Sequence, residues 1–161
     1  MFKKLLYTQT IILLGGSIFA WFTVYTDFVR FYGIEGTVFK IKDCALPNPV
    51  TTPCFWGAFA FVVALVWSIY ILRLVNQSEQ KKQQSRLNWL LIASTLFAWG
   101  NFFYTAIPFW FRGSTPGVGC SGLLMTNPFA TPCFAGSAFF LVALAVSLIL
   151  IKVKYNENSN F

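Results

Sequence analysis

The chain has 161 residues, of which 57% are hydrophobic, 19% are aromatic and 11% are charged, and its formal net charge is +7. A soluble domain carries about 25% charged residues, so this chain has too few polar side chains to cover a surface exposed to water. It contains no histidine, which excludes histidine-based catalytic triads, histidine-ligated zinc and haem with an axial histidine. The abundance of apolar residues excludes disorder and predicts an integral membrane protein.

Four apolar stretches are long enough to cross a bilayer, which takes about 20 residues in a helix. They lie at about residues 5–26, 54–75, 88–111 and 133–153. Lipid offers no hydrogen-bond partners to the backbone, so each stretch is expected to be an α-helix. The sequence therefore predicts an all-α membrane protein with four spans.

The positions of the basic residues predict which side of the membrane each loop faces. Lysine and arginine gather in the cytoplasmic segments of membrane proteins. Eight of them lie before the first stretch, around the connection between the second and third, or after the fourth, whereas four lie in the other two loops. Both termini and the linker 77–87 are therefore predicted to be cytoplasmic, and loops 27–53 and 112–132 to lie outside the plasma (inner) membrane. The eight residues are Lys3, Lys4, Arg73, Lys81, Lys82, Arg86, Lys152 and Lys154.

Residues 48–72 and 127–151 indicate an internal duplication. Aligned without gaps, they are identical at 12 of 25 positions and share the pattern N-P-x-x-T-P-C-F-x-G, which apolar bias alone does not explain. The preceding spans also match, Ser17–Trp21 with Thr95–Trp99. Self-similarity of this kind is the signature of a repeat architecture.

The predicted repeat unit is a span, an outer loop with two cysteines and a second span. Residues 1–76 form the first unit, residues 88–161 form the second, and residues 77–87 join them on the cytoplasmic side. Two units with the same orientation are related by a pseudo-two-fold axis along the membrane normal. The predicted fold is a four-helix bundle of two tandem, parallel-oriented two-helix repeats with disulfide-bonded outer loops.

The shared motif predicts the same entry from an outer loop into a helix in both units. Threonine is a natural N-cap, and proline fits the first helical position because no backbone donor is needed there. Asn-Pro favours a turn just before the helix, and a glycine one turn into the helix allows close helix approach. A ligand bound at the entry is the alternative interpretation. The motif residues are Asn48, Pro49, Thr52, Pro53 and Gly57 in the first unit and Asn127, Pro128, Thr131, Pro132 and Gly136 in the second.

All four cysteines lie in or next to the predicted outer loops, a distribution that fits an oxidising compartment. The simplest of the three possible pairings is one bond per unit, Cys44–Cys54 and Cys120–Cys133. Each bond would stabilise the fold by roughly 2–4 kcal/mol in the chain-entropy model. Thiol–disulfide exchange is the alternative role, because a helix N-terminus stabilises a thiolate at Cys54 and Cys133. The cysteine spacing does not match the usual spacing of metal ligands, so no metal site is predicted.

In span count, orientation and cysteine placement, the chain resembles two groups of four-helix membrane proteins. These are the bacterial proteins that reoxidise periplasmic disulfide oxidases with quinone, and the vitamin K epoxide reductases. The resemblance implies redox-active cysteines and a quinone cofactor. The C-x-x-C pair of those proteins is absent, because nine residues separate Cys44 from Cys54 and twelve separate Cys120 from Cys133.

The lack of recognisable catalytic groups favours a non-catalytic function without a cofactor. The predicted role is a membrane scaffold, accessory subunit or partner-binding protein with a disulfide-stapled outer cap. Its expected partners are the lipid bilayer and another membrane protein or a second copy, and not nucleic acid, since topology accounts for the basic residues. The first alternative is a membrane thiol–disulfide oxidoreductase linked to quinone or a partner protein. The second is a small-solute channel or carrier, which a parallel repeat permits.

Overall fold

Four long helices make up the computed structural model, which describes residues 2–41, 46–111, 117–118 and 124–158. The helices are α1 (Phe2–Glu35), α2 (Pro53–Arg73), α3 (Gln77–Phe111) and α4 (Pro132–Asn158). All four are long and apolar enough to cross a membrane. The prediction of an all-α, multi-pass membrane protein is confirmed to this extent.

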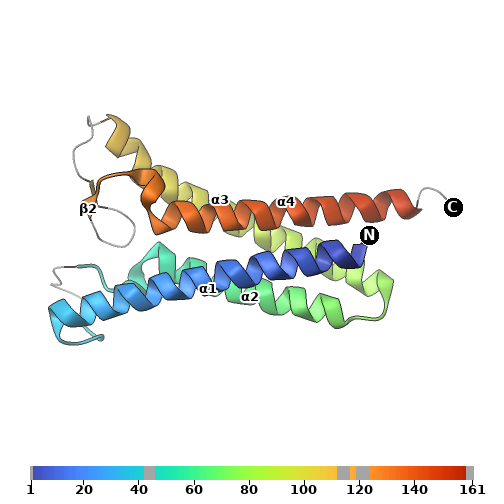
Figure 1. Ribbon diagram of the computed structural model, residues 1–161, viewed down its shortest axis with the longest axis horizontal. Helices are drawn as coiled ribbons and strands as arrows, with labels where there is room; N and C mark the ends of the chain where they lie inside the picture. The colour runs from blue at the N-terminus through green and yellow to red at the C-terminus, as the bar shows by residue number, and fades with distance from the viewer. Residues whose placement is uncertain (1, 42–45, 112–116, 119–123, 159–161) are drawn as a thin grey trace.

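Smaller elements lie next to the helix ends at one end of the molecule (Figure 1). The one-turn 3-10 helices η1 (Pro49–Thr51) and η2 (Pro128–Ala130) precede α2 and α4. Strands β1 (Gly117–Val118) and β2 (Leu124–Met125) form a short antiparallel pair. Both chain termini and the α2–α3 turn lie at the opposite end (Figure 1).

The helices are arranged as a ring in the order α1, α2, α3, α4. Helix α1 packs against α2 and α4, α3 packs against the same two helices, and α2 and α4 meet only weakly across the diagonal. The apolar core includes Leu13, Phe61, Leu91 and Phe140, each 0–2% exposed. The Phe61 and Phe140 rings stack at 3.7 Å between centroids with an interplanar angle of 13°. The diagonal contact between α2 and α4 therefore includes a direct ring stack.

Helix α1 is longer than the sequence predicted, because residues 27–35, expected in the outer loop, continue the helix. Asp27 Oδ1 accepts a hydrogen bond from Arg30 Nη1 at 3.1 Å, so two opposite charges one turn apart neutralise each other. Phe31, 1% exposed, adds apolar contact in the same segment. The helix ends at Gly36, whose φ of +69° is the left-handed conformation typical of a helix C-terminus.

The predicted linker 77–87 is also helical and forms the first turns of α3. Only residues 74–76 separate α2 from α3. Gln80 Nε2 donates to Leu74 O at 2.5 Å and to Ile71 O at 3.4 Å, which satisfies carbonyls at the end of α2. Glutamine, glutamate, lysine and arginine are good helix formers, and this composition explains why the polar segment does not remain a loop.

Candidate functional site

The two helix entries share the same turn hydrogen bond, although the φ angles of the two asparagines differ, −61° at Asn48 and −146° at Asn127. Asn48 Oδ1 accepts from Val50 N at 3.0 Å, and Asn127 Oδ1 accepts from Phe129 N at 3.0 Å. Each bond closes the turn predicted at Asn-Pro and starts the 3-10 helix. Asn48 also donates through Nδ2 to Val38 O and Lys40 O, at 3.0 and 2.8 Å. In the first half, the entry is thus tied to the segment that follows α1.

Thr52 and Thr131 occupy the predicted N-cap positions, with φ of −82° in both and ψ of 147° and 146°. Their hydroxyls donate backward to Pro49 O at 2.7 Å and to Pro128 O at 2.6 Å. The side chain of Thr52 makes no capping bond to α2, whereas Thr131 Oγ1 accepts from Phe134 N at 3.4 Å. The threonines therefore stabilise the preceding turns, and side-chain capping by both is not found.

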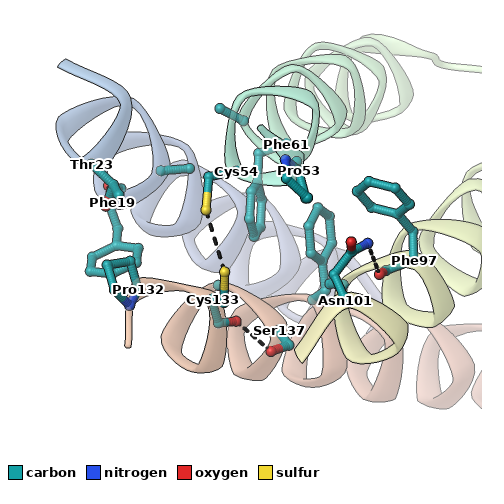
Figure 2. A pocket seen from close by; sticks show the side chains of 16 residues that line it. Phe19, Thr23, Pro53, Cys54, Phe61, Phe97, Asn101, Pro132, Cys133 and Ser137 are labelled. Atoms are coloured by element: carbon teal, nitrogen blue, oxygen red, sulfur yellow. Dashed lines mark hydrogen bonds between the residues drawn. The ribbon is translucent and has the colours of Figure 1, made fainter. Parts of the chain in front are cut away.

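Pro53 and Pro132 begin α2 and α4, as predicted, and place a cysteine in the first turn of each helix. The side chains of Cys54 and Cys133 point toward one another across the bundle, with 3.4 Å between their Sγ atoms (Figure 2). These cysteines are far apart in the chain, and only the diagonal meeting of α2 and α4 brings them together.

The two cysteines are in different chemical states. Cys133 is disulfide-bonded, whereas Cys54 is a free thiol. Because a disulfide sulfur has no proton, the Cys54 S–H is the donor in the contact with Cys133. The expected Cys44–Cys54 bond is thus not formed at Cys54, whose sulfur instead faces Cys133. Cys44 and Cys120 lie outside the described residues, and so does the partner of Cys133.

A cavity of about 60 Å³ lies beside the sulfur pair and is lined by residues of all four helices (Figure 2). Two alignments, Ser17–Trp21 with Thr95–Trp99 and residues 48–72 with 127–151, sort fourteen of the sixteen described lining residues into seven pairs of matching positions. Extending the first alignment by two residues adds Thr23 and Asn101 as the eighth pair. The pairs are Phe19 and Phe97, Ala20 and Ala98, Thr23 and Asn101, Pro53 and Pro132, Cys54 and Cys133, Gly57 and Gly136, Ala58 and Ser137, and Phe61 and Phe140.

Gly57 and Gly136 do not have the role that was predicted for them. A Cβ atom built on either glycine meets nothing within 4 Å, so neither lies at a close helix contact. Both line the cavity instead. The close approach is found at Gly16, where a Cβ would collide with the Phe61 ring. The pattern of the motif indicated a constraint at these glycines but not its cause.

The polar side chains that line the cavity are hydrogen-bonded to their own helices. Thr23 Oγ1 donates to Phe19 O at 3.0 Å, and Asn101 Nδ2 donates to Phe97 O at 2.7 Å. Ser137 Oγ donates to Cys133 O at 2.5 Å. None of the described lining residues is charged. The cavity therefore presents a mostly apolar wall with two sulfur atoms and the side-chain oxygen of Asn101.

The sequence did not identify Phe19, Thr23, Phe97 and Asn101 as site residues. The match between Ser17–Trp21 and Thr95–Trp99 was a signal for Phe19 and Phe97, whereas Thr23 and Asn101 lie two residues beyond the matched segments. Among the described residues, no group of three or more histidine, cysteine, aspartate or glutamate side chains is arranged to hold a metal ion. No protein-family model, curated protein or solved structure matches the chain. Function is therefore inferred from the residues and their geometry.

Proposed function

We propose that the protein is a membrane thiol–disulfide exchange protein and that Cys54 and Cys133 are its reacting pair. The observation that carries this proposal is the distance of 3.4 Å between the Sγ of free Cys54 and the Sγ of disulfide-bonded Cys133. A disulfide exchanges when a thiolate attacks one of its sulfurs directly. In this protein the attacking and attacked atoms are already at contact distance.

The exchange balances within the chain. Cys54 loses its proton, its sulfur bonds to Cys133 Sγ, and the existing disulfide of Cys133 breaks. The released sulfur leaves as a thiolate and takes up a proton, so the numbers of thiols and disulfides are unchanged. The product is a Cys54–Cys133 bond between α2 and α4. The released thiol then attacks a disulfide of a partner protein, so that a mixed disulfide forms and the displaced sulfur of the partner leaves as a thiol. Quinone is the alternative oxidant, and it would take up two electrons and two protons when the released thiol and a second thiol join in a disulfide.

The similar helix entries support the proposed architecture of two tandem, parallel-oriented repeats. Beyond the matching turns and N-cap angles, the same aromatic pair recurs in each half. Trp21 and Phe55 meet edge to face with centroids 6.4 Å apart, and Trp99 and Phe134 do so at 6.3 Å. Two units of one orientation place their equivalent cysteines near the common axis, which is what the exchange requires.

The proposed location is the plasma membrane, with both termini cytoplasmic and the cysteines at the outer end of the bundle. Most basic residues belong to the segments near the termini and the α2–α3 turn, which share one end of the molecule (Figure 1). This distribution supports the cytoplasmic assignment of that end. The exchange site would then face an oxidising compartment, where disulfides form and persist.

The proposal is tested by mapping the cysteines in native membranes. Free thiols are alkylated under acid quench, bonded pairs are identified by mass spectrometry, and the mapping is repeated over a series of glutathione redox potentials. We expect a Cys54–Cys133 bond to be populated alongside the other disulfide of Cys133. Cys54→Ser should abolish the former and leave the latter, and Cys44→Ser is the matched control, which should leave the Cys54–Cys133 bond detectable.

Two results would overturn the exchange function. One is a Cys133 disulfide whose reduction potential lies below about −300 mV, the range typical of structural disulfides, together with no Cys54–Cys133 bond at any potential. The other is a stable Cys44–Cys54 bond. Either result would favour the non-catalytic scaffold or partner-binding role with a disulfide-stapled cap. A channel has less support, because the stacked Phe61 and Phe140 rings close the cavity. These rings lie one helical turn beyond Gly57 and Gly136, counted from the helix entries.

A further inference from the structure

The cavity beside the sulfur pair is open at one end and closed at the other. Cys54, Cys133 and Gly57 are partly exposed, whereas Ala58, Phe61, Ser137 and Phe140 are buried. The order of these residues along α2 and α4 runs from the helix entries into the bundle. The cavity is thus reached from the sulfur end and ends at the stacked phenylalanine rings.

Small residues leave this space unfilled. At Gly57 and Gly136, an added Cβ would meet nothing within 4 Å. Protein interiors are normally close-packed, and glycines in membrane bundles usually mark close helix contacts. Both glycines instead border empty volume at equivalent positions of α2 and α4. The absence of side chains at these two positions keeps the cavity open.

The wall defines the chemistry of an occupant. Three polar side chains donate to carbonyls of their own helices, which leaves the side-chain oxygen of Asn101 as a free acceptor. None of the described lining residues is charged, and phenylalanine rings line the cavity on all four helices. A mostly apolar cavity with so few free polar groups does not hold ordered water well and accepts apolar molecules. A charged ligand would find no opposite charge among the described lining residues.

We propose that this cavity is a binding site for an uncharged, predominantly apolar, membrane-soluble molecule, one end of which enters between α2 and α4 and lies against Cys54. The volume of about 60 Å³ admits a short alkyl segment or the edge of one ring, and the rest of the molecule extends outward. The inference does not depend on the exchange function, because Cys54 acts in its test only as a reporter at the cavity wall.

The test measures the modification rate of the Cys54 thiol in proteoliposomes by mass spectrometry of its peptide. The probes are methanethiosulfonates that carry octyl, benzyl or negatively charged sulfonatoethyl groups. We expect the two uncharged probes to react at least tenfold faster than the charged one, with rates that saturate as their concentration rises. Similar rates for charged and uncharged probes would overturn the proposal.

A second reporter separates binding from simple partition into the membrane. Gly100→Cys in the Cys54→Ser background places a thiol on an exposed face of α3, where nothing lies within 4 Å of an added Cβ. Its rate should rise linearly with the concentration of each uncharged probe. If Cys54 also shows only linear rates, membrane partition explains the reactivity and there is no site.

Matched substitutions test the cavity itself. Gly57→Leu or Gly136→Leu should fill it and slow the modification of Cys54 by the octyl probe at least tenfold, whereas Gly100→Leu should not. Gly57→Ala adds one methyl group in open space and should retain most of the rate, so it controls for a general loss of fold. Unchanged rates in both leucine variants would contradict the proposal. If the rate saturates at a lower concentration of the octyl probe than of the benzyl probe, the natural occupant is identified as a lipid chain. The reverse order would identify it as a ring compound.

Discussion

Gly16 shows most directly how a single residue positions the site. A Cβ at this position would collide with the Phe61 ring, whereas a Cβ at the adjacent Gly15 would make an ordinary contact of 3.7 Å with Phe139. Phe61 stacks on Phe140 and closes the cavity. The absence of a side chain at Gly16 therefore fixes where α1 meets α2 and where the phenylalanine pair lies.

This contrast predicts opposite effects for two neighbouring substitutions. Gly16→Ala should destabilise the protein by about 1–3 kcal/mol, as overpacking does. Gly15→Ala should be neutral or stabilising, because alanine is favoured over glycine in a helix by about 1 kcal/mol. Unfolding in mixed micelles with increasing dodecyl sulfate measures both changes. Equal effects of the two substitutions would show that the Phe61 contact does not matter.

At the level of the elements, a buried polar cluster joins helices α1, α3 and α4. Gln84 Nε2 donates to Gln9 Oε1 at 3.0 Å and to Ser147 Oγ at 3.1 Å. All three residues are 0–2% exposed. Within the described part of the chain, Gln9 Nε2 and Gln84 Oε1 are buried without a hydrogen-bond partner. The cluster links three helices but is only partly satisfied.

Because the hydrogen bonds of this cluster are only partly satisfied, substitutions at Gln84 and Gln9 should have non-additive effects on stability. Gln84→Leu should destabilise the bundle by about 1–2 kcal/mol, because it leaves Gln9 and Ser147 without their donor. Adding Gln9→Leu should recover part of this loss, since it removes the polar atoms left unpaired. The exposed Lys81→Ala should change stability by less than about 0.5 kcal/mol. A double mutant equal to the sum of the single mutants would show that the two glutamines are not coupled.

The sequence predicted the start of α2 and α4 well because the information there is local: proline at the first helical position and an Asn-Pro turn before it. The predicted helix ends were wrong at Asp27 and in the linker 77–87, where charged and polar residues were expected to lie in loops but are helical. In both places the polar groups are accommodated by partners, Arg30 for Asp27 and the end of α2 for Gln80. The contact between Cys54 and Cys133 depends on helix packing, which no local pattern encodes.

At the scale of the whole molecule, the proposed orientation makes opposite predictions for the two ends. Phe39, 87% exposed, follows α1, and Val75, 95% exposed, lies in the α2–α3 turn. In right-side-out vesicles, a membrane-impermeant maleimide should label Phe39→Cys and should reach Val75→Cys only after the membrane is permeabilised. Peptide mass spectrometry identifies the labelled site. The reverse pattern would place the cysteine end of the bundle in the cytoplasm.

The paired lining of the cavity has a consequence for the proposed duplication. Six of its eight equivalent pairs are the same amino acid in both halves, compared with 12 of 25 positions in the aligned segments. If the proposed duplication is correct, the two halves differ less around the cavity than elsewhere in the aligned segments. Two pairs differ, Thr23 with Asn101 and Ala58 with Ser137. At these positions the wall of the cavity departs from the proposed two-fold symmetry. In the proposed two-fold arrangement, an occupant rotated by half a turn would meet nearly the same wall. Among the described lining residues, these four side chains would distinguish its two orientations.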